Sequence, residues 1–339
     1  MAPQGRAALF SLEERRLTSE IRKHKAKRVL LQLPEGLKPY APKIATIVED
    51  AGARCFILAD PCYGACDLAF SEAQVVGADL IVHYGHTQMI RRSGTLTVYF
   101  DARAKLEVKT AVKRALRLLK SWNYIGLVTS VQLVHELAAA RKVLVEDGKT
   151  VVIGDSGRLK YAGQVIGCDY SNAKVVEDQA DAFLFVGGGK FHAVGVSLAT
   201  SKPTVVADPY EKRAYSVESE AQRIRKQRMT SVSEARKAQT FGVLVGLKPG
   251  QSRLRDAIRI KDKLKSSGKK ALLFAAREIT PEILMQFPTI DAFVSTACPR
   301  LALDDSIRFS KPLLMVREAL AAIGGVDWNT LCKGSWFEN

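Results

Sequence analysis

The sequence predicts an α/β protein made of three homologous domains, each with a parallel sheet, arranged around a pseudo-threefold axis. Two observations predict this fold. Short, almost continuously apolar strands alternate with helical segments, which is the pattern of a parallel sheet covered on both faces. The same order of elements then recurs three times along the 339 residues, which indicates an internal triplication. We place the domains at residues 1–105, 106–212 and 213–339.

Four strands are expected in each domain. In the first domain they cover residues 28–33, 54–59, 80–84 and 96–100, in the second 125–129, 151–153, 183–186 and 204–207, and in the third 241–245, 271–274, 292–295 and 313–316. A capping box at Ser11-Leu12-Glu13-Glu14 is expected to open an N-terminal helix. The basic stretch 211–239 is interpreted as a solvated linker helix, with a docking surface for a macromolecular substrate as the alternative.

Two cysteine turns occupy equivalent places in the first two domains. Cys66-Asp67 ends the segment Asp60-Pro61-Cys62-Tyr63-Gly64-Ala65-Cys66-Asp67, and Cys168-Asp169 lies within Gly163–Ser171. Cys66-Asp67 is followed by Ala78-Asp79, and Cys168-Asp169 by Ala180-Asp181 at the same distance along the chain. Each Ala-Asp pair precedes an apolar strand. We expect each cysteine at a strand-to-helix turn, where a helix N-terminus lowers the thiol pKa and favours metal binding. Asp67 is expected to cap the following helix.

The third domain offers Cys298 at the carboxyl end of its third strand. Ligand sites of parallel sheets lie at that edge, so Cys66, Cys168 and Cys298 converge if the three edges face one another. Three isolated thiolates suit an iron–sulfur cluster better than zinc, whose structural sites use four ligands in closely spaced pairs. Three buried core cysteines remain the alternative at this point.

Composition limits the environment and the partners. The formal net charge of +16 indicates an acidic or nucleic-acid-associated partner, but no nucleic-acid-binding motif is found, so direct binding to nucleic acid is not required. No apolar run approaches the roughly 20 residues that span a bilayer, and the N-terminus lacks a signal-peptide core. We therefore expect a cytoplasmic protein without membrane contact, in which six cysteines do not form structural disulfides.

These motifs resemble the diphthamide-biosynthesis enzymes, the 2-(3-amino-3-carboxypropyl)histidine synthases. The resemblance runs from about residue 28 to residue 305 and is carried by three cysteine motifs with supporting short matches. The motifs are Tyr63-Gly64-Ala65-Cys66-Asp67, Gly163-Gln164-Val165-Ile166-Gly167-Cys168-Asp169-Tyr170-Ser171, and Ala297-Cys298-Pro299-Arg300 with Leu303-Asp304-Asp305. The supporting matches are Pro34-Glu35-Gly36, Gly85-His86, Phe191-His192 and Asp208-Pro209-Tyr210. The chain length is similar to that of the archaeal homodimeric form.

The resemblance implies a function and its cofactors. Cys66, Cys168 and Cys298 would hold a [4Fe–4S] cluster, and S-adenosylmethionine would bind against its open iron. A one-electron reductant would then start a radical reaction that transfers the 3-amino-3-carboxypropyl group to C2 of a histidine on translation elongation factor 2. The resemblance also implies a homodimer.

Further residues are candidates for the S-adenosylmethionine site. Gly187, Gly188 and Gly189 follow a strand and open a helix, where backbone N–H groups could approach the carboxylate of the cosubstrate, or could simply form a tight turn. His192, Asp208 and Arg300 are candidates for the same pocket. For His86, His135 and His192 a core position is the alternative, and for Arg300 a surface ion pair.

The remaining cysteines have simpler interpretations. Cys55 lies in an apolar strand and is expected in the core. Cys62, four residues before Cys66, is interpreted as a turn residue or as an additional cluster ligand. Cys332 lies outside the region of resemblance.

Two competing functions remain open at this stage. The first is a quinolinate-synthase-like [4Fe–4S] dehydratase, which also has three α/β domains around a three-cysteine cluster. The second is a non-enzymatic, basic, translation-associated binding protein whose cysteines are merely buried.

Overall fold

Three parallel sheets form the framework of the molecule. The computed structural model describes residues 9–90, 94–304, 306–332, 334, 336 and 337. The strand orders are β2-β1-β3-β4, β6-β5-β7-β8-β9 and β11-β10-β12-β13. In each sheet the first strand of the unit lies between the second and the third, and the fourth lies outside the third. This shared order confirms the predicted α/β class with three parallel sheets.

The first unit begins with a helix that packs beside its sheet. Its elements are α1 (Glu14–Lys23), β1 (Arg28–Gln32), η1 (Glu35–Tyr40), α2 (Ala41–Asp50), β2 (Arg54–Ile57), α3 (Phe70–Val76), β3 (Leu80–Tyr84) and β4 (Leu96–Phe100). The predicted capping box is wrong. Glu13, which precedes α1, has left-handed backbone geometry with φ of 50°, and its side chain makes no capping hydrogen bond. Its carboxylate instead pairs with Arg16 at 2.8 Å.

The second unit carries one strand that the sequence did not indicate. Its elements are α4 (Lys109–Leu119), β5 (Tyr124–Thr129), η2 (Val131–Glu136), α5 (Leu137–Glu146), β6 (Thr150–Val152), α6 (Ser171–Lys174), η3 (Glu177–Gln179), β7 (Ala182–Val186), α7 (Phe191–Thr200), β8 (Thr204–Asp208) and β9 (Arg213–Ser216). The additional strand β9 pairs antiparallel with β8. The domain boundaries near residues 105 and 212 stay predictions.

The long helix α8 (Glu218–Lys237) connects the second unit to the third. The elements of the third unit are β10 (Thr240–Gly246), η4 (Pro249–Gln251), α9 (Leu254–Ser266), β11 (Lys270–Ala276), α10 (Pro281–Met285), β12 (Ala292–Ser295), α11 (Pro299–Leu303), η5 (Ser306–Arg308), β13 (Leu313–Met315), α12 (Val316–Ala322) and α13 (Trp328–Cys332). Among the described residues, no helix is long and apolar enough to cross a membrane.

An aspartate at the same point of each unit explains part of the repeated sequence. Asp79, Asp181 and Asp291 stand just before the third strand of their units. Each carboxylate accepts backbone N–H hydrogen bonds at the start of the unit's first strand, from Lys27 and Arg28, from Asn123 and Tyr124, and from Gln239 and Thr240. These bonds satisfy backbone donors where the parallel ladder begins. They lower the pKa of the Asp181 and Asp291 carboxyls.

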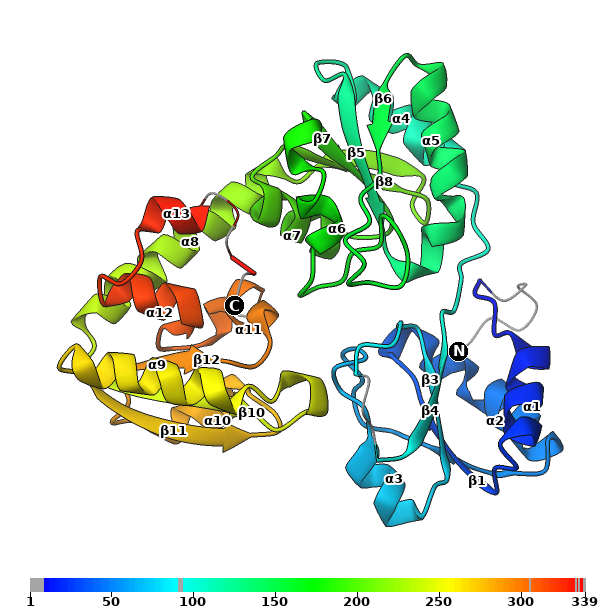
Figure 1. The fold of residues 1–339 in the computed structure, drawn as a ribbon, viewed down its shortest axis with the longest axis horizontal. Helices are drawn as coiled ribbons and strands as arrows, with labels where there is room; N and C mark the ends of the chain where they lie inside the picture. Colours follow the sequence, from blue (N-terminus) through cyan, green and yellow to red (C-terminus); the bar gives the residue numbers. More distant parts are fainter. Residues whose placement is uncertain (1–8, 91–93, 305, 333, 335, 338–339) are drawn as a thin grey trace.

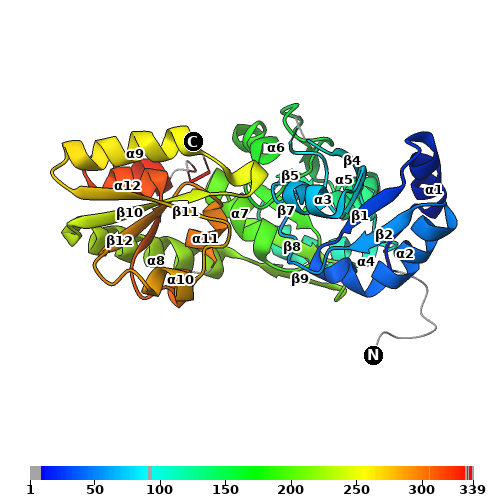
Figure 2. The same cartoon turned by 90° about the horizontal axis from the view of Figure 1, so that it is seen from below.

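The three units form three lobes of a flat molecule (Figures 1 and 2). The connecting helix α8 runs from the second lobe to the third, where it contacts α12. Arg228 on this helix corrects the interpretation of a solvated linker. Its guanidinium is fully buried and pairs with Glu318 at 2.6 Å while donating to the carbonyls of Ala302 and Leu313. One face of α8 is therefore part of the packing between the lobes.

Candidate metal centre

Cys66 lies on the loop between β2 and α3, and the third unit holds this loop in place. The N–H of Gly250 donates to the carbonyl of Cys66 at 2.8 Å, and Nε2 of Gln251 donates to its Sγ at 3.3 Å. Gly250 can approach so closely because it has no side chain, since a Cβ there would lie 2.6 Å from Cα of Cys66. The 3₁₀ turn η4 and the Cys66 loop therefore form one interface.

Asp67 does not cap a helix, contrary to the prediction. The helix α3 begins only at Phe70, and the buried carboxylate of Asp67 lies 3.4 Å from Nζ of Lys248 in the third unit. Lys248 also pairs with Glu278 at 2.9 Å. A buried ion pair therefore joins the two units beside Cys66. Sequence reasoning missed Lys248 and Gln251, although Pro249-Gly250 is a turn signal directly after an apolar strand.

Cys168 and Cys298 reach the same region from the other two units. Cys168 lies on the loop between β6 and α6, and Cys298 directly precedes α11 at the carboxyl end of β12. Together with Cys66 they line one central cavity of about 1550 Å³. Residues of all three units line this cavity, including His86, Gln164, His192 and Arg300. The three predicted cysteines are thus brought together.

The thiols influence one another electrostatically. Burial, together with smaller contributions from the neighbouring Cys298 and Cys66, raises the pKa of the Cys168 thiol to about 12. Burial also raises the pKa of Cys66 and of Cys298, opposed by the Gln251 hydrogen bond and by the backbone of Arg300, respectively. The expectation that a helix N-terminus lowers the pKa of Cys66 and of Cys168 is therefore wrong. Desolvation is the largest cause of each rise in pKa, and for Cys66 the following helix begins only four residues later.

The spacing of the thiols distinguishes between metal centres. Among the described residues, only Cys62, His83 and His86 form a trio whose ligand atoms all lie within 4.8 Å of one another. At least one pair among the sulfurs of Cys66, Cys168 and Cys298 therefore lies more than 4.8 Å apart, whereas three thiolates on one tetrahedral zinc would all lie roughly 3.8 Å from one another. A wider set around one cavity fits a polynuclear cluster, in which each sulfur binds a different metal atom.

Arg300 presents an unused hydrogen-bond donor near this centre. Its Nε and Nη2 bind the Asp304 carboxylate in a bidentate pair at 2.6 and 2.7 Å, and its guanidinium stacks on Phe191 at 3.8 Å. Its Nη1 is buried and has no partner. The ion pair therefore joins a buried guanidinium to a carboxylate at the surface, and Nη1 of Arg300 is left to bind an acceptor.

His192 is the second residue of α7 and lines the cavity. Its ring stacks on Phe185 at 5.6 Å and meets the edge of Phe191 at 4.9 Å. Burial lowers its pKa to about 3, helped by the positive charge of Arg300. His192 is consequently neutral at physiological pH.

The glycine turn makes contacts that are mostly internal. Gly189 has φ of +73° and donates its N–H to Oδ2 of Asp208 at 3.2 Å, and the ring of Tyr210 packs where a Cβ on Gly188 would lie. Neither Gly187, Gly188, Gly189 nor Asp208 is among the residues that line the central cavity. Their role in cosubstrate binding stays a prediction. The glycines are also needed for the turn itself, because of the positive φ of Gly189 and the close packing of Tyr210 on Gly188.

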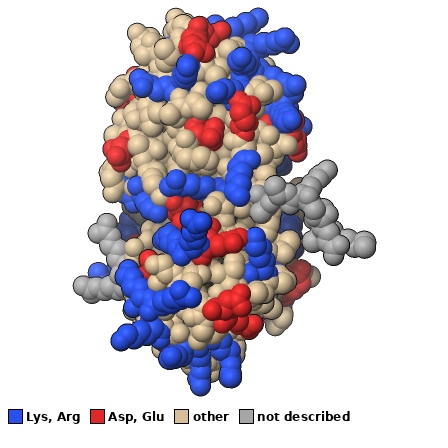
Figure 3. Space-filling model, turned by 90° about the vertical axis from the view of Figure 1, so that its right-hand side faces the viewer, with Lys and Arg blue, Asp and Glu red and all other residues tan. Residues whose placement is uncertain are grey.

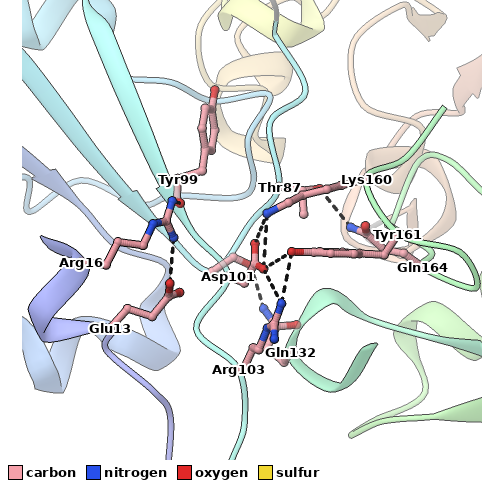
Figure 4. A network of polar contacts seen from close by, with 11 residues as sticks. Glu13, Arg16, Thr87, Tyr99, Asp101, Arg103, Gln132, Lys160, Tyr161 and Gln164 are labelled. Carbon is pink, nitrogen blue, oxygen red and sulfur yellow. Dashed lines mark hydrogen bonds and ion pairs between the residues drawn. The ribbon is translucent and has the colours of Figure 1, made fainter. Parts of the chain in front are cut away.

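A polar network fixes the Cys168 loop against the first unit (Figure 4). Asp101, buried beyond the end of β4, accepts hydrogen bonds from Lys160 at 3.0 Å and from the hydroxyl of Tyr161 at 2.5 Å. Gln164, four residues before Cys168, donates to Oγ1 of Thr87 at 3.0 Å. The Oε1 of Gln164 is buried without a partner. Ordered loops from two units therefore position Cys168.

Of the other cysteines, Cys55 and Cys332 pack against hydrophobic cores, as expected for Cys55. Cys62 is buried and is not among the residues that line the cavity. His135 lies on η2, also outside the cavity lining.

Fold and site together define a class of protein: three repeated α/β units, each of which presents one cysteine to a shared central cavity. Comparison with known proteins then gives the family. Residues 33–332 match the family of diphthamide synthesis proteins, and the chain belongs to this family.

Individual relatives cover almost the whole chain. It is 36% identical over 318 residues to a 2-(3-amino-3-carboxypropyl)histidine synthase of Pyrococcus horikoshii, covering 93% of this chain and 91% of that protein. It is 32% identical to subunit 1 of the Schizosaccharomyces pombe synthase, covering 97% and 79%. A crystal structure of Pyrococcus horikoshii Dph2 with a 4Fe–4S cluster superimposes with a TM-score of 0.87 at 34% identity, covering 94% of this chain and 93% of that one.

Proposed function

We propose that this protein is a 2-(3-amino-3-carboxypropyl)histidine synthase that modifies a histidine of translation elongation factor 2 in the first step of diphthamide biosynthesis. The observation that carries the proposal is the placement of Cys66, Cys168 and Cys298, one from each unit, around a single cavity. The relatives that share this fold are named as such synthases, and one of them holds a 4Fe–4S cluster.

The three cysteines would hold the cluster through their thiolates, with one iron left open. When bound, the cluster supplies the electron that cleaves the bond between the sulfur and the γ-carbon of S-adenosylmethionine. The chain supplies ordered surroundings for the ligands. Burial of all three thiols and the loops fixed by Gln251 and Asp101 keep the ligands in place before the cluster arrives.

Two buried groups match the amino-acid end of S-adenosylmethionine. Nη1 of Arg300 is a donor without a partner, and Oε1 of Gln164 is an acceptor without one. Both residues line the cavity. We assign Arg300 to the carboxylate and Gln164 to the ammonium group, because an unpaired buried polar atom gains most from a partner of the opposite kind. Neutral His192 would pack beside them.

The proposal extends to the oligomeric state, the compartment and the electron supply of the enzyme. We propose that it acts as a homodimer in the cytoplasm, supplied with single electrons by a reductant. The six cysteines are all free thiols in the structure, as a reducing compartment requires. The face shown in Figure 3 carries more basic than acidic side chains, and the chain as a whole has a net charge of +16, which suits an acidic macromolecular partner.

The test is a transfer assay. The anaerobically reconstituted protein is incubated with dithionite, S-adenosylmethionine labelled in its carboxyl group and elongation factor 2, and the factor is analysed by mass spectrometry. We expect one labelled 3-amino-3-carboxypropyl group on a single histidine. Cys168→Ala should abolish transfer, whereas the matched Cys55→Ala should retain it. Full transfer by Cys168→Ala would overturn the proposed centre, and a colourless protein with intact thiols would favour a binding protein instead.

A further inference from the structure

A second group of potential metal ligands lies outside the three-cysteine centre. Cys62, His83 and His86 each offer one ligand atom, and these atoms all lie within 4.8 Å of one another. Cys62 is 2% exposed and His83 is fully buried. His86 lines the central cavity, whereas the buried Cys62 and His83 are not among the residues that line it. No function described so far uses this group.

The hydrogen bonds of Gln32 fix the orientation of His83. Nε2 of Gln32 donates to the carbonyl of Asp67 at 2.6 Å, so its Oε1 faces Nδ1 of His83 at 2.9 Å and accepts a hydrogen bond from it. With the proton on Nδ1, Nε2 of His83 carries a lone pair. This lone pair points toward His86, whose Nδ1 is 3.0 Å away. A histidine that donates its other N–H to a buried acceptor is the usual arrangement of a metal ligand.

Both imidazoles are available as neutral ligands. Burial lowers the pKa of His83 well below its usual range, and His86 lowers it further. Burial also lowers the pKa of His86 to about 4, although the carbonyl of Tyr84 and the carboxylate of Glu35 oppose this. Metal binding therefore does not have to displace an imidazolium proton at neutral pH.

The surroundings of Cys62 also favour a cation. Burial raises the pKa of its thiol to about 12, and the negative charges of Asp67 and Glu35 contribute to the rise. The same charges would stabilise a positive ion beside the sulfur. The backbone N–H of Gly64 opposes the rise because it hydrogen-bonds the thiolate form. Without a metal, the thiol is protonated.

From this geometry we propose that Cys62, His83 and His86 bind one Zn²⁺ ion. One thiolate and two imidazoles are ligands that zinc prefers, whereas Mg²⁺ and Ca²⁺ require oxygen ligands. Two nitrogens on a tetrahedral zinc lie roughly 3.4 Å apart, so the two rings need to separate by only a few tenths of an ångström. Binding would release the thiol proton of Cys62 and move the proton of His86 from Nδ1 to Nε2.

Three protein ligands leave a fourth position on the ion. In zinc sites with this number of ligands, water or a substrate atom takes that position. The ion would lie behind His86, so it would fix the orientation of a residue in the cavity wall. Zinc binding does not depend on the three-cysteine centre, because the two sites share no ligand.

The experiment measures zinc directly. The full chain with its reconstituted cluster is incubated with ZnCl₂ under anaerobic conditions, desalted and analysed by elemental mass spectrometry and zinc X-ray absorption. We expect one zinc per chain, with one sulfur and two protein nitrogens bound to it. The Cys66→Ala/Cys168→Ala/Cys298→Ala variant should bind the same zinc, which separates this site from any failure of the cluster.

Variants of the site provide the matched controls. Cys62→Ser and His83→Asn should lose most of the zinc, and Gln32→Leu should weaken binding by about 10- to 100-fold, as loss of a hydrogen bond to a ligating histidine does. Cys55→Ser should bind normally. Circular dichroism of the zinc-free variants checks their folding. A wild-type chain without zinc, equal binding by folded Cys62→Ser, or a site with only sulfur ligands would overturn the proposal.

Discussion

Nε2 of Gln251 donates a hydrogen bond to Sγ of Cys66 across 3.3 Å, although the residues are 185 positions apart in the chain. Gln251 belongs to the 3₁₀ turn η4, directly after the first strand of the third unit, and Cys66 to a loop of the first. The contact makes the first cysteine depend on a different unit. The centre is therefore built between units rather than within one.

Replacement of Gln251 by Ala should change the reduction potential of the cluster. A hydrogen bond to a ligating sulfur stabilises the more negatively charged, reduced state. Its removal should lower the midpoint potential by about 40 mV if the bond contributes about 1 kcal/mol. Redox titration followed by electron paramagnetic resonance measures this shift. Gln286→Ala, at an exposed position, should leave the potential unchanged. An unchanged potential in Gln251→Ala would show that Gln251 does not bind the sulfur in the loaded protein.

Acidification should destabilise the protein because of its buried histidines. The pKa values of His83, His86 and His192 are all lowered in the folded state, to about 4 for His86 and about 3 for His192. Between those values and the unfolded value of about 6.5, the unfolded chain binds more protons, so stability rises with pH. The free energy of unfolding should therefore fall as pH decreases from about 6.5 toward 4.

His192→Phe tests this assignment, because a phenyl ring can keep the stacking on Phe185 but cannot take up a proton. The free energy of unfolding is measured with urea at several pH values between 4 and 7. Its increase with pH should be smaller in His192→Phe than in wild type, by up to about 1.4 kcal/mol per pH unit. His135→Asn, on η2 outside the cavity lining, is the control. If the free energy of unfolding depends on pH equally in His192→Phe and in wild type, groups other than His192 cause that dependence.

The buried pair Arg228–Glu318 should be sensitive to the loss of either partner. Arg228→Met leaves the Glu318 carboxylate buried without its cation, which typically costs about 3–5 kcal/mol. The double variant Arg228→Met/Glu318→Leu should be less destabilised than either single variant, because no isolated charge remains. Denaturant unfolding measures these differences, and Arg223→Ala on the exposed face of α8 should have little effect. If the loss of unfolding free energy in the double variant equals the sum of the losses in the two single variants, Arg228 and Glu318 do not stabilise each other.

The sequence predicted the fold well because its signals are local. Apolar strands, the helical segments between them and the repeated Ala-Asp step each follow from neighbouring residues. The repeat of Asp79 and Asp181 is visible in the sequence. The structure gives its reason, because both carboxylates, and that of Asp291, accept backbone N–H groups at the start of the first strand of their units. The grouping of Cys66 and Cys168 followed from the same repetition.

The contacts between units could not be predicted in this way. Lys248 and Gln251 act on a loop of another unit, and no local pattern relates them to Cys66. Arg228 stands in a run of basic residues that is typical of an exposed helix face, but its partner Glu318 lies far along the chain. The helix-dipole argument for Cys66 failed because burial, which depends on all three units, dominates the pKa of its thiol.

Replacement of Gly250 by Ala should prevent η4 from docking on the Cys66 loop. A Cβ at this position would lie 2.6 Å from Cα and 2.8 Å from Cβ of Cys66, and neither atom belongs to a flexible side-chain end. The turn must then shift, so that both the bond from the Gly250 N–H to the Cys66 carbonyl and the bond from Gln251 to Sγ are lost or lengthened. Displacement of one ligand by about 1 Å is enough to impair a site that needs preorganised ligands.

Gly36→Ala provides a matched control for this variant, because Gly36 also lies in a 3₁₀ turn after the first strand of its unit, with no atom within 4 Å of an added Cβ. We expect Gly250→Ala to bind substantially less iron and sulfide per chain than wild type after anaerobic reconstitution, and Gly36→Ala to match wild type. Far-ultraviolet circular dichroism should be the same for all three proteins, because the substitution affects a contact between units and not a sheet. A full cluster content in Gly250→Ala would mean that the Cys66 loop reaches the centre without support from the third unit.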